Sequence, residues 1–287
     1  MRNVDFHADS TIVLRITHLR GTVRGRDGGP IVFDDKNSFT FGLAWAEVAV
    51  TARDLGALLN RYVFAFEGAP LRDLDVRIRG AEIEQSGKLK KGLWIPFRIR
   101  ATVHATDDGR IRLHPTRVRV LGIPAEGVMR WLGIALEDMV SMDRVRGLAV
   151  DGNDLLLDPS ALLPAPKIEG RVTSVRLNGD RLVQIFGSER AAADLGRLRA
   201  PVAPDGNYMF YRGGTLRFGK LVMYDADLEI VDMDPRDPFR FFLDRYNDQL
   251  VAGYSRTLPD LGLAAYMKDL EDLAPEPATP RDTARGR

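Results

Sequence analysis

The stretch LWIPFRIRATVHATDDGRIRLHPTRVRV, residues 93–120, decides the fold class of this chain. Its first half places an apolar residue at every second position, at Leu93, Ile95, Phe97, Ile99, Ala101 and Val103. A period of two is typical of a β-strand with one buried face. The sequence Asp107-Asp108-Gly109 then predicts a hairpin turn into a second strand. Residues 93–105 predict a strand about 44 Å long, whereas an average strand has about 5–6 residues.

An amphipathic helix is predicted on each side of these strands. The first covers residues 51–66, starts with Thr51 as its cap, and has an apolar stripe formed by Leu55, Leu58, Leu59, Tyr62, Val63 and Phe66. The second starts at Pro124, and its apolar face holds Val128, Met129, Leu132, Ala135, Leu136 and Met139. At about 17 residues it spans about 26 Å, less than the long strand. Part of the strand's apolar face therefore needs another cover: a lipid, the C-terminal segments or a second subunit.

The remaining segments read as strands with three further helical regions. Strands are predicted over 11–24, 38–50, 145–158 and 207–232, and residues 170–186 form a hairpin that turns at Asn178-Gly179-Asp180. Helical segments are expected near 189–199, through 241–250 and near 261–272. The predicted fold class is α+β, with a long, curved antiparallel β-sheet and amphipathic helices. We divide the chain into a first domain that contains the N-terminal strands (1–190), a strand and helix extension packed on the same sheet (191–273), and a proline-rich disordered tail (274–287).

The composition narrows the class of protein. Hydrophobic residues are 45% and charged residues 28%, which is typical of a folded globular chain. The net charge of +1 gives no general argument for nucleic acid as a partner. The chain has no cysteine, which excludes disulfides and thiolate metal sites. No apolar run approaches the length of a membrane helix, and the N-terminus has no signal-peptide core. A cytoplasmic protein and an envelope protein that has lost its leader both fit.

No enzyme motif is present, and we expect neither catalysis nor a cofactor. Asp232, Asp234 and Asp237 share one loop and are the best candidates for a metal site, which would make a metal-dependent hydrolase the remaining enzymatic alternative. Their spacing lacks the glycine and distal glutamate of a calcium loop, so we predict turn and capping roles for them. His104 and His114 lie on neighbouring predicted strands. They are either exposed polar residues or a pair of histidines that approach each other across the hairpin, as a metal or acid–base pair would.

Basic residues collect on the polar face of the long strands, opposite the apolar side chains. Arg98, Arg100, Arg117 and Arg119 all alternate with the apolar positions. Residues 71–121 contain twelve Lys or Arg and six Asp or Glu, whereas residues 205–250 contain six and nine. This polarity predicts either peripheral contact of these four arginines with anionic membrane head groups or a solvated outer face.

The pattern of helices set between long alternating strands resembles the tubular lipid-binding (TULIP) superfamily. That group includes bactericidal/permeability-increasing-like proteins and bacterial phospholipid-binding envelope proteins. The resemblance covers residues 48–186 and is carried by VTARDLGALLN (50–60), LDVRIRGAEI (74–83), GRIRLHP (109–115), LGIPA (121–125) and LLLDP (155–159). It implies a sheet wrapped around a long helix, an apolar lumen for acyl chains, and a place in the periplasm or cell envelope.

The sequence therefore predicts a protein that binds a lipid or other long apolar ligand and carries it between membranes or within the cell envelope. The alternative is a non-enzymatic structural or interaction protein with a filled core. The predicted lumen is lined by Leu58, Leu59, Tyr62, Phe97, Ile99, Met129, Leu132 and Leu136. Ligand identity and oligomeric state are not predicted.

Overall fold

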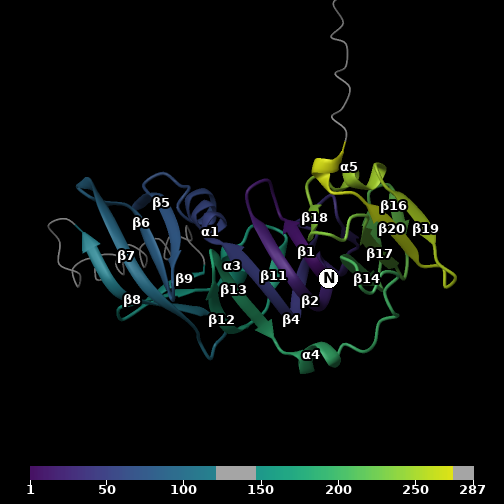
Figure 1. Ribbon diagram of the computed structural model, residues 1–287, viewed down its shortest axis with the longest axis horizontal. Coiled ribbons are helices and arrows are strands. Elements are labelled where there is room, and N and C mark those ends of the chain that lie inside the picture. The colour runs from purple at the N-terminus through teal and green to yellow at the C-terminus, as the bar shows by residue number, and fades with distance from the viewer. Residues whose placement is uncertain (121–146, 274–287) are drawn as a thin grey trace, which may run out of the picture.

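The computed structural model describes residues 1–120 and 147–273. Strands make up 52% of the structure and helices 13%, which confirms a strand-dominated α+β fold with large sheets. The molecule is elongated, with one sheet at one end and the C-terminal strands at the other (Figure 1). In the described ranges, no helix has the length and apolar character that crossing a membrane requires. The second predicted helix and the predicted disordered tail lie outside the described residues.

One end of the molecule is a six-stranded antiparallel sheet in the order β5-β6-β7-β8-β10-β9. Its strands are β5 Leu71–Arg79, β6 Glu82–Lys91, β7 Leu93–Ala105, β8 Ile111–Val120, β9 Leu148–Asp151 and β10 Asp154–Leu157. The predicted 13-residue strand is confirmed as β7, and the turn at residues 106–110 joins it to β8 as predicted. Thr116 is a bulge, because Arg100 pairs with Arg117 and Ala101 pairs with Pro115.

The centre and the other end share a larger sheet in the order β12-β13-β4-β2-β1-β14-β17-β20-β19. Its strands are β1 Arg2–His7, β2 Val13–Gly25, β4 Phe39–Thr51, β12 Val172–Asn178, β13 Arg181–Gly187, β14 Tyr208–Arg212, β17 Asp227–Asp232, β19 Tyr254–Thr257 and β20 Leu263–Met267. Strands β11 Lys167–Glu169 and β18 Phe239–Phe242 pair in parallel with β4 and β1. A small third sheet holds β3 Ile31–Val32, β15 Leu216–Phe218 and β16 Leu221–Met223.

The helices of the described ranges are short. The first predicted helix is confirmed as α1 Ala52–Leu58, which continues into a π-helical turn, Leu59–Val63. Thr51 caps α1 by accepting a hydrogen bond from the backbone N–H of Asp54, as its sequence predicts. The others are α3 Pro159–Leu162, α4 Glu189–Ala193, α5 Tyr246–Val251, and 3₁₀ turns at Arg26–Gly28 and Leu270–Asp272.

Two predicted helical segments are wrong in part. Residues 239–242 form strand β18, so the predicted segment 241–250 is helical only from Tyr246 onward, in α5. Residues 263–267 form strand β20, and a 3₁₀ turn follows it. Both strands pair in parallel with partners distant in sequence, β1 and β17. Tertiary pairing therefore decides the structure of these two segments over their local apolar spacing.

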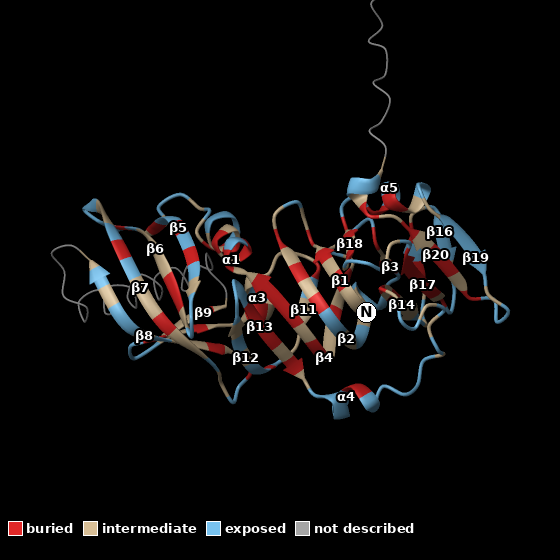
Figure 2. Ribbon diagram, viewed as in Figure 1, coloured by how far each residue is buried: buried red, intermediate tan, exposed pale blue. Residues whose placement is uncertain are grey.

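The core is richest in aromatic side chains where the two ends of the chain meet. Phe241 on β18 is fully buried and stacks on Phe6 of β1 at 5.7 Å between ring centroids. Phe33, Phe39, Phe41, Phe218 and Tyr246 complete this cluster. Figure 2 shows the buried residues concentrated in the central strands, β4 and β13 among them. The C-terminal strands thus share a core with the N-terminal ones.

Candidate functional site

The predicted lumen residues fall into three groups. Leu58 and Phe97 are buried in the apolar core, and Leu59 and Ile99 pack against it while half-buried. Tyr62 is 42% exposed. Met129, Leu132 and Leu136 lie outside the described residues. Phe97 packs tightly against the neighbouring strands: a Cβ added at Gly87 would lie 3.2 Å from its ring.

The inner face of the six-stranded sheet is apolar and combines buried with half-buried side chains. Core residues such as Phe97 alternate with half-buried ones along β7 and β8. The half-buried side chains of this face are Ile78, Ile95, Ile99, Val103, Leu113, Val118, Val120, Val150, Leu155 and Leu157. A strand of 13 residues thus presents a long apolar surface with residual access to solvent.

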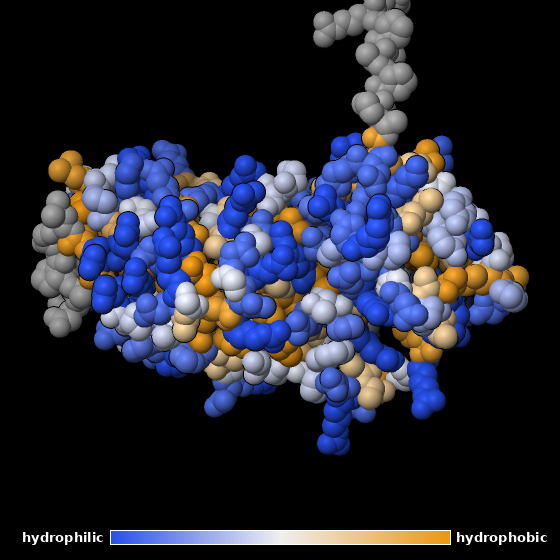
Figure 3. Space-filling model, in the orientation of Figure 1, coloured by the Kyte–Doolittle hydropathy of each residue, from blue (hydrophilic) through white to orange (hydrophobic). Residues whose placement is uncertain are grey.

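A second apolar region lies in the central sheet and was not predicted from the sequence. A cleft of about 680 Å³, the central cleft, opens between β2, β4, β14 and β17 on one side and residues 194–201 on the other. Its walls include Leu19, Phe41, Trp45, Tyr208, Phe210 and Ile230. Figure 3 shows apolar side chains gathered along the middle of the molecule, over the strands of this sheet. The volume is within the range of small-molecule sites, about 300–1,000 Å³.

A narrow pocket of about 30 Å³ continues the central cleft into the sheet. The two share Met1, Leu19, Phe41 and Leu43, and the other apolar walls of the narrow pocket are Leu163 and residues of β1, β2, β4, β11 and β13. Gln184 on β13 is its one polar wall residue among those described, and its side chain is buried, with 6% exposed. No described residue hydrogen-bonds its Oε1. A buried acceptor of this kind favours a ligand group that can donate to it.

The outer wall of the central cleft is a segment without regular structure, residues 194–207, which we call the connector. It follows α4 and leads to β14 along one side of the sheet (Figure 1). Arg199 fixes it in place: Nη1 lies 2.7 Å from Oε2 of Glu229, and Nη2 lies 2.8 Å from Oδ1 of Asp227. The backbone N–H of Val202 also donates to Glu229. Burial lowers the pKa of Arg199, but the hydrogen bonds to both carboxylates outweigh it and leave the pKa raised.

Cationic side chains form part of the lining of the central cleft. Arg20, Arg197 and Arg212 are among the residues that line it. Arg20 donates to the carbonyl of Gly196 and so connects β2 to the connector. Arg197 and Arg212 are exposed. The cleft therefore joins an apolar interior to a basic rim, an arrangement suited to an amphipathic anion.

The four predicted docking arginines come together on the outer face of the six-stranded sheet. Arg98 pairs with Arg119 and Arg100 pairs with Arg117 across β7 and β8. Together with buried Glu84 of β6 they line one shallow depression. Nε of Arg100 donates to Oε2 of Glu84 at 2.8 Å, and this bond holds the pKa of Glu84 below its usual range. We call these four residues the arginine cluster.

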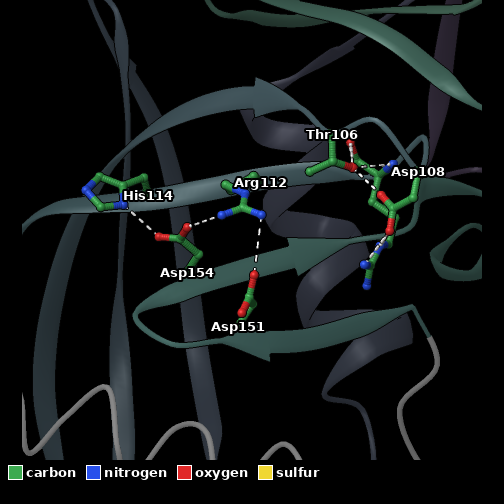
Figure 4. Close-up of polar contacts among 7 residues, drawn as sticks. Thr106, Asp108, Arg112, His114, Asp151 and Asp154 are labelled. Atoms are coloured by element: carbon green, nitrogen blue, oxygen red, sulfur yellow. Dashed lines mark hydrogen bonds and ion pairs between the residues drawn. The ribbon is translucent and has the colours of Figure 1, made fainter.

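A neighbouring polar network ties β8 to the hairpin of β9 and β10 (Figure 4). Nδ1 of His114 lies 2.6 Å from Oδ1 of Asp154, and Arg112 donates to Oδ2 of Asp154 at 2.8 Å and to Asp151 at 3.3 Å. Burial raises the pKa of Asp154, but the bonds to His114 and Arg112 lower it overall. His104 sits opposite Arg112 and His114 opposite Thr102, so the two histidines do not face each other directly. The network joins β8 to β9 and β10 through side chains.

The acidic loop is used for turns. Asp232 accepts a hydrogen bond from the backbone N–H of Asp234, and Asp234 from that of Arg236. The prediction of turn roles for Asp232 and Asp234 is therefore confirmed. The side chain of Asn207 also donates hydrogen bonds to Asp232 and to the backbone carbonyl of Asp237. Within residues 1–120 and 147–273, no three His, Asp or Glu side chains are grouped closely enough to hold a metal ion.

The central cleft escaped sequence reasoning because its walls come from distant segments. Leu19, Phe41 and Phe210 belong to β2, β4 and β14, which meet only through sheet pairing. One local signal was the apolar pair Leu195 and Leu198 in the connector, since both side chains are exposed, at 42% and 44%, and line the cleft. Comparison of the chain with protein-family models, with curated proteins and with solved structures finds no match, so its function is inferred from these sites.

Proposed function

We propose that the protein binds a lipid or another long apolar ligand, and that the central cleft is its binding site. The observation that carries this proposal is a cleft of about 680 Å³ with aromatic and aliphatic walls and a basic rim. Sites of this size, mostly apolar with a few placed polar groups, are typical of small-molecule binding. A protein that shields such a ligand from water can carry it between membranes or within the cell envelope, which is the role we propose.

The rim and the narrow pocket define the expected ligand. Arg20, Arg197 and Arg212 favour an acidic head group, because guanidinium groups bind carboxylates and phosphates through paired hydrogen bonds. The apolar body lies against Leu19, Phe41 and the other walls. A polar donor that reaches the inner end of the ligand would satisfy Gln184.

The lumen predicted from the sequence is part of the same proposal. In it the six-stranded sheet curves around amphipathic helices, and its half-buried inner face, with Phe97 and Ile99, forms a wall for acyl chains. Helix α1 packs against β5 at the edge of this wall. The inner face of the sheet and the central cleft would then bind different parts of one long ligand. Alternatively, the two sites would bind two ligands one after the other.

Replacing Leu19 by tryptophan is expected to block ligand uptake. Leu19 is half-buried and lines both the central cleft and the narrow pocket, so an indole ring there takes ligand space. Affinity for a fluorescent fatty acid should fall by at least about tenfold, equivalent to about 1.4 kcal/mol. The melting temperature should change by less than about 3 °C, as for substitutions outside a packed core. Fluorescence titration and circular dichroism measure the two quantities.

The matched control is Leu221 to tryptophan, which adds the same ring at an exposed position on β16. Its affinity should equal that of the unmodified protein. Equal uptake by both variants would remove the central cleft as the site. A lack of uptake by the unmodified protein would favour the structural or interaction protein instead.

A further inference from the structure

The hairpin that joins β6 to β7 ends in an exposed apolar and basic tip, residues 90–94. Leu93 is 79% exposed, among the most exposed large apolar side chains of the described residues. Lys90 and Lys91 beside it are exposed as well. Gly92 has a φ of 72°, a conformation that suits glycine and allows the chain to reverse within one residue. An exposed leucine at a sharply turned tip gains nothing for the fold, so it favours a contact outside the protein.

Trp94 joins this tip to the basic outer face of the sheet. The guanidinium carbon of Arg72 lies 4.0 Å from the centroid of its ring, and Nζ of Lys90 lies 6.0 Å away. Side chains of a strand alternate between faces, so Trp94, Arg98 and Arg100 share one face of β7. The indole therefore lies among cations, on the face of β7 that also carries the arginine cluster.

The arginine cluster carries more positive charge than the surrounding residues neutralise. Like charges placed directly opposite on neighbouring strands are destabilising, and this face has two such pairs, Arg98 with Arg119 and Arg100 with Arg117. Arg100 has Glu84 as its partner. In the part of the chain that the structure describes, the side chains of Arg98, Arg117 and Arg119 form no hydrogen bond or ion pair. An external anion would offset this repulsion.

We propose that this end of the six-stranded sheet docks on the surface of an anionic phospholipid bilayer. Leu93 and Trp94 enter the interface, where tryptophan is favoured, while Lys90 and Lys91 extend to the head groups. The arginine cluster then binds lipid phosphates, and each basic residue near the surface adds to the attraction. An exposed leucine next to the tryptophan fits a bilayer better than a nucleic acid, which offers no apolar interior.

The charge distribution orients the molecule in this contact. Residues 71–121 carry twelve basic and six acidic residues, whereas residues 205–250 carry six and nine. The basic sheet and the acidic C-terminal strands lie at opposite ends of the long axis (Figure 1). Hydrophilic side chains cover the visible face of β5, β6 and β7, and apolar surface marks the outer corner of this sheet in Figure 3. An anionic surface would thus attract one end and repel the other.

Sedimentation with lipid vesicles tests this inference, which does not depend on ligand binding by the central cleft. The unmodified protein should bind vesicles of phosphatidylcholine with 30% phosphatidylglycerol and not phosphatidylcholine alone, with weaker binding at high salt. The double variant Arg98→Gln/Arg119→Gln should lower the partition coefficient about 25-fold, at about fivefold per basic residue. The control Arg190→Gln/Arg217→Gln removes two exposed arginines elsewhere and should change nothing.

The apolar part of the contact has its own variants. Leu93→Ser/Trp94→Ser should weaken vesicle binding at least about tenfold, because the variant has less apolar side-chain area to bury in the bilayer interface. The control Val251→Ser/Tyr224→Ser alters two similarly exposed residues of the C-terminal part and should bind normally. Because the chain has no cysteine, Leu93→Cys also gives a unique site for an environment-sensitive dye. Its emission should shift to the blue with anionic vesicles, and that of a dye at Val251→Cys should not.

Three results would overturn the docking surface. The first is equal binding to neutral and anionic vesicles. The second is a failure of the variants: vesicle binding that is unchanged in both double variants, or a dye at position 93 whose emission does not shift to the blue with anionic vesicles. The third is arginine-dependent binding of a single-stranded oligonucleotide without binding to vesicles, which would assign the basic face to nucleic acid. Circular dichroism of each variant checks that the fold is retained.

Discussion

Replacing Arg199 by alanine is expected to lower the free energy of unfolding by about 3–5 kcal/mol, because it leaves a buried carboxylate without its partner. Glu229 is fully buried, and its Oε2 lies 2.7 Å from Nη1 of Arg199. The guanidinium also lies over the ring of Phe210, at 4.3 Å from its centroid. The loss should release the connector and widen the central cleft. Urea denaturation followed by circular dichroism measures the stability.

The control for this experiment is Arg197→Ala, two residues earlier in the same connector. Arg197 is exposed, so its replacement should change stability by less than about 0.5 kcal/mol. A second variant, Arg199→Met/Glu229→Leu, removes both charges and should recover most of the loss, since buried ion pairs are often replaceable by apolar side chains. Equal stability of Arg199→Ala and Arg197→Ala would show that the connector does not depend on this ion pair.

Replacing Phe241 by alanine should cost about 3–5 kcal/mol, as for other fully buried phenylalanines. Phe241 contacts Phe6, Phe33 and Tyr246, so it joins β18 and α5 to the N-terminal strands. We expect the N-terminal and C-terminal parts of the large sheet to unfold together. The test follows unfolding by far-ultraviolet circular dichroism and by tryptophan fluorescence in the same samples.

Phe242 is the matched control because it follows Phe241 on the other face of β18. It is only half-buried and stacks on His7, so its replacement by alanine should cost clearly less. If Phe241→Ala melts the C-terminal strands alone, with Trp45 of β4 unaffected, residues 191–273 form an independent unit and the shared core is not essential to the sheet.

The parts of the fold that could be predicted are those whose structure depends on residues close together in the sequence. Strand β7 and its turn into β8 follow from a period of two and an Asp-Gly turn, and both signals lie within about 20 residues. The cap of α1 by Thr51 is equally local. By contrast, β18 and β20 have short apolar runs that fit a helix or a strand. Their pairing with β1 and β17 decides between the two, and no local pattern carries that information.

The candidate sites divide in the same way. Strand parity alone places Arg98 and Arg100 on one face, and hairpin register then brings Arg117 and Arg119 beside them, so the arginine cluster was predictable. The central cleft was not, because Leu19 and Phe210 meet through strands separated by most of the chain. The buried position of Glu229 was equally hidden, since an acidic residue on a strand normally predicts exposure.

Native mass spectrometry of the gently purified protein tests the central claim most directly. If the central cleft holds a lipid or another apolar ligand, the unmodified protein should carry an additional mass equal to one such molecule. Leu19→Trp should lose that mass, and Leu221→Trp should keep it. A bare protein mass for all three proteins, both as purified and after incubation with fatty acids and phospholipids, would contradict ligand binding and leave the protein with a filled core as the better account.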